Sequence, residues 1–429
     1  MSLTYAELPE RIERAYTSLG EQGLARRDYV ALESDNTLDA LLLLLATLNG
    51  GHHVALLPSA GDAPTPAFCR YRLRSDAVLV PNAQWNGANA IDSRGALLAR
   101  TSGTTGQAKL ACHSLERLKI NATNCRQRFM LSKTDRVFIP VALAHMFGLG
   151  AGVLPALLAG ASIELLAQAN VLTYFAREAR FAPTVTYLTP AFCQALARAR
   201  KAPRAYRLTV TAGDRIDRES FDAYEALHGP LVSLYGSTEL GAIAAGCVDD
   251  PSLERRASSG RPMAGVTVTL RSADGEAGEL LIEHPSGFLG YADSCGRPIG
   301  QDAVHRSADL GRVLADGSVR VLGRLDHQAK RDGKLVALGD VEAALEQLPQ
   351  FRRAVAFADH RAPPGPRGSY LVACCEAADG TAWDEKALRR ASMDVLPKHA
   401  IPDRFHPVIE WPQLPSGKID RQALIKKYT

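Results

Sequence analysis

The stretch YVALESDNTLDALLLLLATLNGGHHVALL, residues 29–57, decides the fold class. It begins with the apolar run YVALE, continues with a leucine-rich segment of helical length over residues 38–48, and ends with the apolar run HVALL. Strand, helix and strand in this order are typical of a parallel sheet covered by helices. The sequence therefore predicts an α/β fold from the first of these strands onward.

The same alternation continues through the first half of the chain. Further apolar runs, separated by segments of helical length, lie at residues 96–100, 136–140, 162–166, 184–188, 207–211 and 231–235. Beyond about Asp249, short strands punctuated by Gly and Asp indicate a β subdomain, with hairpin turns at 273–275 and 315–317. Residues 326–429 alternate helices and strands and are expected to form a small α+β domain.

Composition excludes several function classes. Fifty basic and forty-six acidic side chains leave a net charge of +4 without a Lys/Arg block, so a dedicated nucleic-acid binder is disfavoured. The longest apolar run, LLLLLAT at 41–47, is too short to span a bilayer, and the N-terminus does not resemble a signal peptide. Eight scattered cysteines lack zinc-site spacing, and we expect reduced thiols in a cytoplasmic protein.

A polar segment after one predicted strand is a candidate for ligand binding. TSGTTGQAKL, residues 101–110, follows the strand at 96–100 and is expected to precede a helix. It is either a solvated turn or a cradle whose backbone N–H groups and hydroxyls hold phosphate at the carboxyl edge of a sheet. Gly103, Gly106 and Lys109 do not fit the GxxxxGK[ST] spacing, so a P-loop NTPase is disfavoured.

A second polar segment, YGSTEL at residues 235–240, follows the strand at 231–235. Thr238 can bond an α-phosphate and Glu239 can hold Mg²⁺, because a hard cation takes oxygen ligands and needs few from the protein when phosphates supply the rest. The alternative is a strand end followed by a helix N-cap. No G-x-S-x-G elbow occurs, which disfavours a serine hydrolase.

Three more segments follow in order: HRSADLGR at 305–312, GRLD at 323–326 and LPSGKIDR at 414–421. With the two polar loops, they make the sequence similar to the adenylate-forming superfamily, which comprises acyl- and aryl-CoA ligases, adenylation domains of nonribosomal peptide synthetases, and luciferases. The resemblance runs from about Val30 to Leu424. It implies an AMP-forming acid–thiol ligase that uses ATP and Mg²⁺, in which a carboxylate displaces pyrophosphate and a thiol then takes the acyl group.

The resemblance implies a domain division and a fold. A large N-terminal domain, residues 1–325, is expected to contain stacked, mostly parallel sheets with covering helices and the β subdomain. A small mobile α+β domain, residues 326–429, is expected to carry the catalytic lysine. Asp326 matches the family's hinge residue, and Gly333 is expected beside the tunnel for the thiol.

Individual roles follow from the same resemblance. The residues expected to act in catalysis are Lys418, Thr238, Glu239 and His145, with Glu239 as the metal ligand. The residues expected to bind the nucleotide are Thr101, Ser102, Gly103, Thr104, Thr105, Gly106, Lys109, Gly213, Asp214, Tyr235, Gly236, Ser237, Asp309 and Arg324. The chain departs from the family where Ser307-Ala308-Asp309 replaces the usual Thr-Gly-Asp and where Ser233 replaces an Asn.

The acid pocket is expected to be small and apolar. The residues expected to line it are His145, Met146, Phe147, Leu234, Gly236 and Ala242. Amino-acid-activating members place an Asp in this stretch, and its absence from residues 144–147 disfavours an α-amino acid. His145 is either the histidine of aryl and fatty acyl ligases or a core histidine. A hydroxybenzoate-like acid is expected, transferred to the phosphopantetheine of a holo acyl carrier protein or, alternatively, to free CoA.

Overall fold

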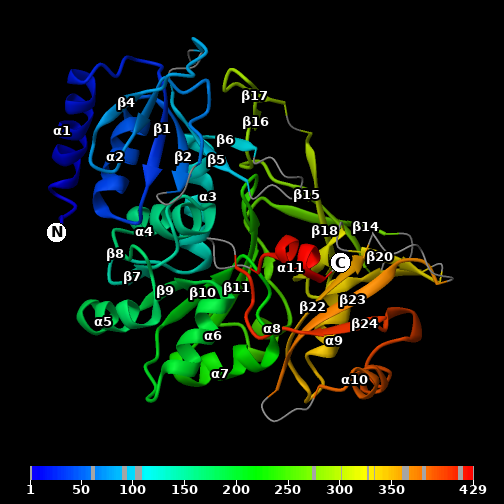
Figure 1. Cartoon of the computed structure of the whole chain (residues 1–429). Helices are drawn as coiled ribbons and strands as arrows, with labels where there is room; N and C mark the ends of the chain where they lie inside the picture. Colours follow the sequence, from blue (N-terminus) through cyan, green and yellow to red (C-terminus); the bar gives the residue numbers. More distant parts are fainter. Residues whose placement is uncertain are drawn as a thin grey trace. The chain divides into compact units, whose positions relative to one another are not determined.

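The computed structural model describes residues 2–58, 63–88, 94–101, 109–272, 277–300, 302–325, 328–332, 334–359, 367–378, 383–413 and 419–428. The chain divides into two compact units (Figure 1). Unit 1 comprises Met1–Gly213, Asp222–Thr267 and Glu283–His305; unit 2 comprises Asp214–Phe221, Val268–Ile282 and Arg306–Thr429. The boundary expected after residue 325 stays a prediction, because residues 326 and 327 lie outside the described part.

Unit 1 contains two large sheets. The eight-stranded sheet has the order β17-β16-β6-β5-β2-β1-β3-β4. Its strands are β1 (Tyr29–Ser34), β2 (His53–Pro58), β3 (Tyr71–Leu73), β4 (Leu79–Pro81), β5 (Ala96–Arg100), β6 (Leu110–Ser114), β16 (Gly290–Ala292) and β17 (Pro298–Ile299). Pairings among β1, β2, β3 and β5 are parallel, whereas β6, β16 and β17 are joined by antiparallel pairings.

The seven-stranded sheet has the order β13-β12-β11-β10-β9-β7-β8. Its strands are β7 (Arg136–Ile139), β8 (Ser162–Leu165), β9 (Val185–Leu188), β10 (Leu208–Ala212), β11 (Leu231–Ser237), β12 (Gly241–Ala245) and β13 (Arg261–Pro262). The strands from β8 to β11 pair in parallel, and β12 and β13 add an antiparallel edge. The α/β prediction is therefore confirmed.

Helices cover both sheets of unit 1. They are α1 (Leu8–Glu21), α2 (Leu38–Asn49), α3 (Leu115–Arg128), the π-helix η1 (Phe147–Val153), α4 (Leu154–Ala159), α5 (Val171–Phe181), α6 (Pro190–Ala199), α7 (Arg218–His228, which begins in unit 2) and α8 (Ser252–Ala257). The leucines of α2 are buried on nearly every side, which explains why this segment lacks a polar stripe. Helix α3 contacts both β6 and β12 and so links the two sheets (Figure 1).

Unit 2 contains three smaller sheets. The strands are β14 (Thr267–Arg271), β15 (Gly278–Glu283), β18 (Val304–Val313) and β19 (Val319–Arg324) in one sheet, β20 (Gln328–Arg331) and β21 (Lys334–Ala337) in a hairpin, and β22 (Phe351–Asp359), β23 (Tyr370–Ala377) and β24 (Arg404–Pro407) in the third. The helices are α9 (Leu338–Leu345), α10 (Glu385–Ser392), the 3₁₀ helix η3 (Lys398–Ala400) and α11 (Arg421–Tyr428). The predicted turn at 315–317 joins β18 to β19, whereas residues 273–276 lie outside the described part.

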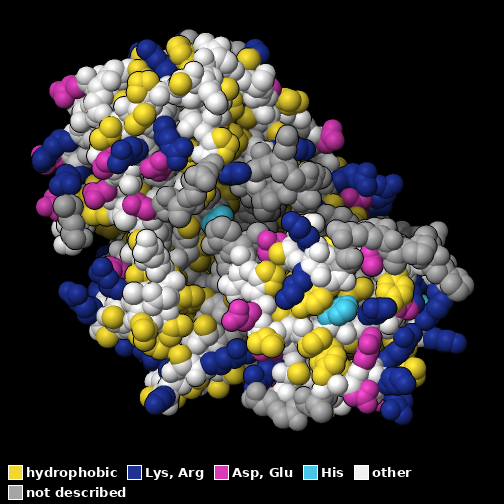
Figure 2. Space-filling model, viewed as in Figure 1, with side chains coloured by type: hydrophobic (Ala, Val, Ile, Leu, Met, Phe, Trp, Pro, Cys, Tyr) yellow, Lys and Arg dark blue, Asp and Glu magenta, His cyan; other side chains and the backbone are white. Residues whose placement is uncertain are grey.

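The surface matches the composition. Basic and acidic side chains lie interspersed over most of the face shown in Figure 2, as the small net charge implies. All eight cysteines are free thiols. Among the described residues, no helix is long and apolar enough to cross a membrane.

Candidate active site

The ends of the first polar loop are held together by two hydrogen bonds, one between main-chain groups and one from a main-chain amide to a side-chain hydroxyl. The Thr101 amide donates to the Lys109 carbonyl over 2.9 Å, and the Lys109 amide donates to Thr101 Oγ1 over 3.2 Å. The expectation that a helix follows the loop is wrong. The loop is followed by strand β6, which pairs antiparallel with β5 in the same sheet. Helix α3 begins only after this strand, at Leu115. Ser102, Gly103, Thr104, Thr105 and Gly106 lie outside the described residues.

The second polar loop is a tight hairpin rather than a strand end before a helix. Strands β11 and β12 pair antiparallel, and the Leu240 amide donates to Ser237 Oγ over 3.0 Å across the turn. Gly236 faces Ala242, and a Cβ on Gly236 would lie 2.4 Å from the Gly241 carbonyl oxygen. Only glycine fits there, so the hairpin requires the glycine of the motif.

Glu239 is fixed at both its main chain and its carboxylate. The Phe288 amide donates to the Glu239 carbonyl over 2.7 Å, and the Tyr291 hydroxyl donates to Glu239 Oε1 over 2.8 Å. Tyr291 lies on β16, which pairs with β6 immediately after Lys109. The Lys109 ammonium lies 4.9 Å from the centroid of the Tyr291 ring, within the range of a cation–π contact. The structure therefore brings the two predicted loops to one tyrosine.

Thr238 is held from β6. His113 Nε2 lies 2.8 Å from the Thr238 carbonyl oxygen, and because a carbonyl only accepts, this nitrogen carries the proton. Burial lowers the pKa of His113 to about 4, so the imidazole is neutral near pH 7. A neutral histidine anchors the motif without placing a second positive charge beside the predicted phosphate site.

The surroundings of Glu239 fit a divalent cation that also binds phosphate. One carboxylate oxygen accepts the Tyr291 hydroxyl, and within the described residues the other oxygen accepts no hydrogen bond. The described part of the chain contains no group of three or more His, Cys, Asp or Glu side chains that could hold a metal ion. Mg²⁺ dehydrates reluctantly and is commonly held by one or two carboxylates together with substrate phosphates. A single oriented carboxylate suits that mode of binding.

The predicted acid-pocket residues gather around a π-helix. Met146 is buried at the start of η1, and the Phe147 ring packs edge-on against Tyr187 with centroids 5.8 Å apart. His145 is exposed, so the core-histidine interpretation is wrong. Helix η1 packs against β12, which carries the buried Ala242.

One buried side chain ties this wall together. Asn121 Nδ2 donates to the Gly150 carbonyl over 2.8 Å, and Asn121 Oδ1 accepts from the Ala242 amide over 2.9 Å. The side-chain amide of Asn121 on α3 thus fixes the π-helix relative to β12. Leu234 and Gly236 lie on β11, which pairs with β12. The structure thus places η1 against β12 and β12 beside β11, and the assignment of these residues to an acid pocket stays a prediction.

The remaining predicted residues fall into three groups. Gly213 directly follows β10 and has a φ of +98°, a backbone conformation that favours glycine. Its neighbour Asp214 is exposed. Asp309 and Arg324 lie opposite each other on β18 and β19 of unit 2, with Arg324 Nη1 3.3 Å from Asp309 Oδ1. Lys418, Asp326 and Gly333 lie outside the described residues.

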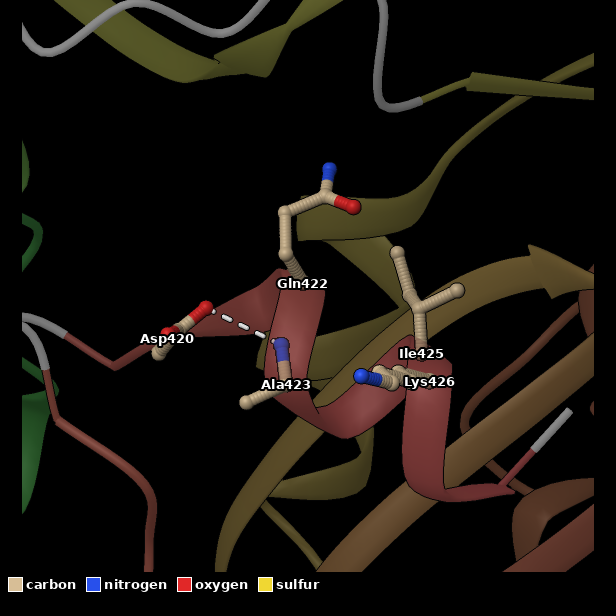
Figure 3. Close-up of a pocket in the computed structure, with 5 residues that line it drawn as sticks. All are labelled: Asp420, Gln422, Ala423, Ile425 and Lys426. Carbon is tan, nitrogen blue, oxygen red and sulfur yellow. Dashed lines mark hydrogen bonds between the residues drawn. The ribbon is translucent and has the colours of Figure 1, made fainter. Parts of the chain in front are cut away.

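Unit 2 has a surface hollow of about 480 Å³ beside helix α11, just after the predicted lysine segment. Figure 3 shows its lining residues, which are Asp420, Gln422, Ala423, Ile425 and Lys426. Asp420 Oδ1 accepts from the Ala423 amide over 3.0 Å and so caps the first turn of the helix (Figure 3). Among the predicted site residues that the structure describes, none lines this hollow.

The departure at Ala308 carries backbone strain. Ala308 adopts φ +55°, the left-handed region in which the family's usual glycine is comfortable. The amide of the next residue, Asp309, donates a hydrogen bond to Ser307 Oγ over 2.9 Å and so closes this turn. The chain therefore keeps the turn that presents Asp309 at some cost in stability.

We expect Ala308→Gly to leave the free energy of unfolding unchanged or to raise it by up to about 1 kcal/mol. Glycine relieves the left-handed strain, which costs about 1–2 kcal/mol. It also loses more backbone entropy on folding than alanine does, which costs about 0.5–1 kcal/mol and offsets part of this gain. The control Ala391→Gly, inside α10, should lower the free energy of unfolding by about 1 kcal/mol. Chemical denaturation of both variants tests this, and equal losses would contradict strain at Ala308.

Three residues that hold the site were not found from the sequence. Tyr291, His113 and Asn121 act through partners 52, 125 and 121 residues away, respectively. Each lies in an ordinary strand or helix pattern, and no local signal distinguishes it from a core or surface residue. Strand pairing and helix packing alone bring them to the motifs.

Comparison with known proteins agrees with this geometry. Residues 92–292 match the family model described as AMP-binding enzyme. The chain is similar to sulfoacetate–CoA ligase from Cupriavidus necator, with 28% identity over 77% of this chain and 66% of the relative, which is just under two thirds of the relative's length. It is also similar to salicyl-AMP ligase / salicyl-S-ArCP synthetase from Mycobacterium tuberculosis, with 26% identity over 99% of this chain and 85% of the relative.

A solved structure supports the fold. The ATP-bound MatB from Rhodopseudomonas palustris superimposes with a TM-score of 0.85 and 22% identity, covering 99% of this chain and 93% of that one. A likeness at this identity establishes the architecture, including a large N-terminal and a smaller C-terminal part. Fold, motif order and family match agree: residues 92–292 match the AMP-binding enzyme family, and the chain is similar over most of its length to acid–CoA ligases and aryl acid ligases of the adenylate-forming superfamily.

Proposed function

We propose that the chain is an AMP-forming acid–thiol ligase that adenylates a small aromatic carboxylic acid and transfers the acyl group to a phosphopantetheine thiol. The observation that carries the proposal is the arrangement of Lys109, Tyr291 and Glu239 at the two polar loops. It sets one cation and one carboxylate beside the loop that the family uses for ATP. The residue roles below belong to this proposal.

In the first step, a carboxylate oxygen of the acid attacks the α-phosphorus of ATP, and the bond from that phosphorus to pyrophosphate breaks. Lys109 and the hydroxyl-rich loop from Thr101 bind the β- and γ-phosphates, and Thr238 bonds the α-phosphate. Glu239 holds Mg²⁺, which offsets the negative charge on the phosphate oxygens when it is bound. Lys418 lies between the carboxylate and the α-phosphate, because a flexible ammonium can follow developing charge.

In the second step, the thiol attacks the acyl carbonyl, its proton is released, and AMP leaves. The C-terminal domain, residues 326–429, turns about Asp326 between the steps, which withdraws Lys418 and brings Gly333 to the thiol's path. Such domain motion lets one site run two reactions in turn. Asp309, facing Arg324 on the adjacent strand, binds the ribose of the nucleotide.

The acid is proposed to be aromatic because of the pocket wall. Met146 and Phe147 provide an apolar surface, and residues 144–147 contain no carboxylate that could pair with an α-amino group. His145 is exposed just before η1. A buried ammonium without a partner would be costly. The name of the salicyl-AMP ligase relative supports a hydroxybenzoate-like acid.

The acceptor is proposed to be a holo acyl carrier protein. The second name of the mycobacterial relative, salicyl-S-ArCP synthetase, supports a carrier-bound thiol. Free CoA is the second candidate, and the sulfoacetate–CoA ligase relative favours it. Both acceptors present the same phosphopantetheine thiol, so the chemistry of the second step is shared.

Acid-dependent ATP–pyrophosphate exchange across benzoic, hydroxybenzoic, cinnamic, fatty and amino acids tests the proposal. We expect exchange confined to one or two benzoates, since the proposed pocket is small and apolar. The active acid is then offered with holo carrier protein or with CoA, and thioester formation identifies the acceptor. Exchange with fatty or amino acids alone would refute the pocket assignment, and absence of exchange with every acid would refute the reaction class.

A further inference from the structure

Tyr291 lies against two groups of opposite charge that the proposed function uses separately. The Lys109 ammonium is 4.9 Å from the centroid of the Tyr291 ring, and the Tyr291 hydroxyl donates to Glu239 Oε1 over 2.8 Å. Lys109 is exposed, whereas Glu239 and Tyr291 are half-buried. In the described part of the chain, Lys109 and Glu239 contact the same side chain and form no ion pair with each other.

A direct ion pair between these groups would disable both. An ammonium bound to the carboxylate would occupy the oxygen that a divalent cation needs, and it would withdraw the positive charge that the phosphates need. Opposite charges in a partly desolvated site attract strongly enough to pair unless something separates them. The tyrosine gives each group a substitute partner, because its ring face attracts the ammonium and its hydroxyl satisfies one carboxylate oxygen.

The position of Tyr291 is fixed by its neighbours. It faces Ala111 in the antiparallel pairing of β16 with β6, and β6 starts one residue after Lys109. The Phe288 ring packs edge-on against the Tyr291 ring with centroids 5.0 Å apart, and the Phe288 amide holds the Glu239 carbonyl. The same short segment therefore fixes the tyrosine and the residue that it orients.

We propose that Tyr291 is a positioning residue that keeps Lys109 and Glu239 apart and leaves one oxygen of Glu239 directed at the metal. The inference rests on the proposed function, because that function assigns Lys109 to phosphate and Glu239 to Mg²⁺. Tyr291 itself contacts neither the acid nor the reacting atoms in this assignment. Its loss acts on metal binding and leaves the apparent affinity for the acid unchanged.

Binding of Mn²⁺ in place of Mg²⁺, followed by electron paramagnetic resonance at a saturating non-hydrolysable ATP analogue, measures this directly. Tyr291→Phe keeps the ring and loses the hydroxyl, and should weaken Mn²⁺ binding about threefold to tenfold. Tyr291→Leu also removes the ring face and should weaken it more. Adding Lys109→Met to Tyr291→Leu should restore part of the Mn²⁺ affinity, because the competing ammonium is gone.

Tyr71→Phe is the matched control. Its hydroxyl donates to the Gly23 carbonyl over 3.1 Å from β3 of the same sheet, and its removal should leave Mn²⁺ binding at the wild-type value. Exchange assays should show an unchanged KM for the acid in all three tyrosine variants and a raised Mg²⁺ requirement only in those at Tyr291. A general loss of stability is not expected to raise the Mg²⁺ requirement while leaving the KM for the acid unchanged.

The outcomes separate the two proposals. Wild-type Mn²⁺ affinity in both Tyr291 variants, with an active wild-type enzyme, would overturn the role of Tyr291 alone. If Lys109→Met weakens Mn²⁺ binding by the same factor with and without Tyr291, the charge-separation role is overturned, since the two residues then act independently. A wild-type protein that binds no Mn²⁺–nucleotide and catalyses no exchange would overturn the proposed function as well.

Discussion

Lys418→Ala is expected to lower acid-dependent ATP–pyrophosphate exchange about a thousandfold, because the variant loses a charged donor directed at the transition state. Thioester formation from supplied acyl-adenylate should fall far less, since Lys418 is proposed to leave the site before the thiol enters. Both rates are measured with the same acid and acceptor. The comparison separates a residue of the first step from one that supports the whole enzyme.

The control for this variant is Lys426→Ala. Lys426 is exposed on α11, eight positions further along, and should be replaceable without effect on either step. Equal loss of both half-reactions in Lys418→Ala would contradict the two-conformation assignment of the C-terminal domain. Unchanged exchange would remove Lys418 from catalysis.

Glu239→Gln is expected to raise the Mg²⁺ concentration needed for half-maximal exchange by about tenfold or more, because an amide is a weaker ligand than a carboxylate for a hard cation. The amide oxygen can still accept the Tyr291 hydroxyl, so the side chain stays in place while its charge is lost. A Mg²⁺ titration of the exchange rate measures the shift.

Glu225→Gln provides the comparison for a carboxylate outside the motif. Glu225 pairs with Arg255 over 2.8 Å on the far side of β11, and its loss should change stability without changing the Mg²⁺ requirement. An unaltered titration in Glu239→Gln would show that Glu239 is not the metal ligand.

The strands of the two large sheets were predictable because parallel strands are buried on both faces. β1, β2 and β5 therefore read as continuous apolar runs, and α2 reads as a helix without a polar face. Strand β6 was missed because LACHS is short and mixes polar and apolar residues, so the loop before it was expected to lead directly into a helix. Its identity as a strand depends on partners on both sides, β5 and β16.

The candidate site was predictable as two motifs but not as one geometry. The motifs are local and appear in the sequence as compact polar segments after strands. The contacts of Tyr291 join residues 52 and 182 positions apart, which depends on how β16 is added to the sheet. A single sequence contains no periodicity that specifies such a pairing.

The π-helix η1 has a consequence for how this pocket can change. The hydrogen bonds of a π-helix span one more residue than those of an α-helix, so a π segment corresponds to one residue inserted into an α-helix. Deleting one residue within Phe147–Val153 would restore α-helical hydrogen bonding and turn the preceding side chains by about 100° relative to those that follow. Met146 would then present a different surface to β12 while both flanking strands kept their places. Under the proposed pocket assignment, a change in the length of η1 would therefore alter which acid this chain accepts without any substitution.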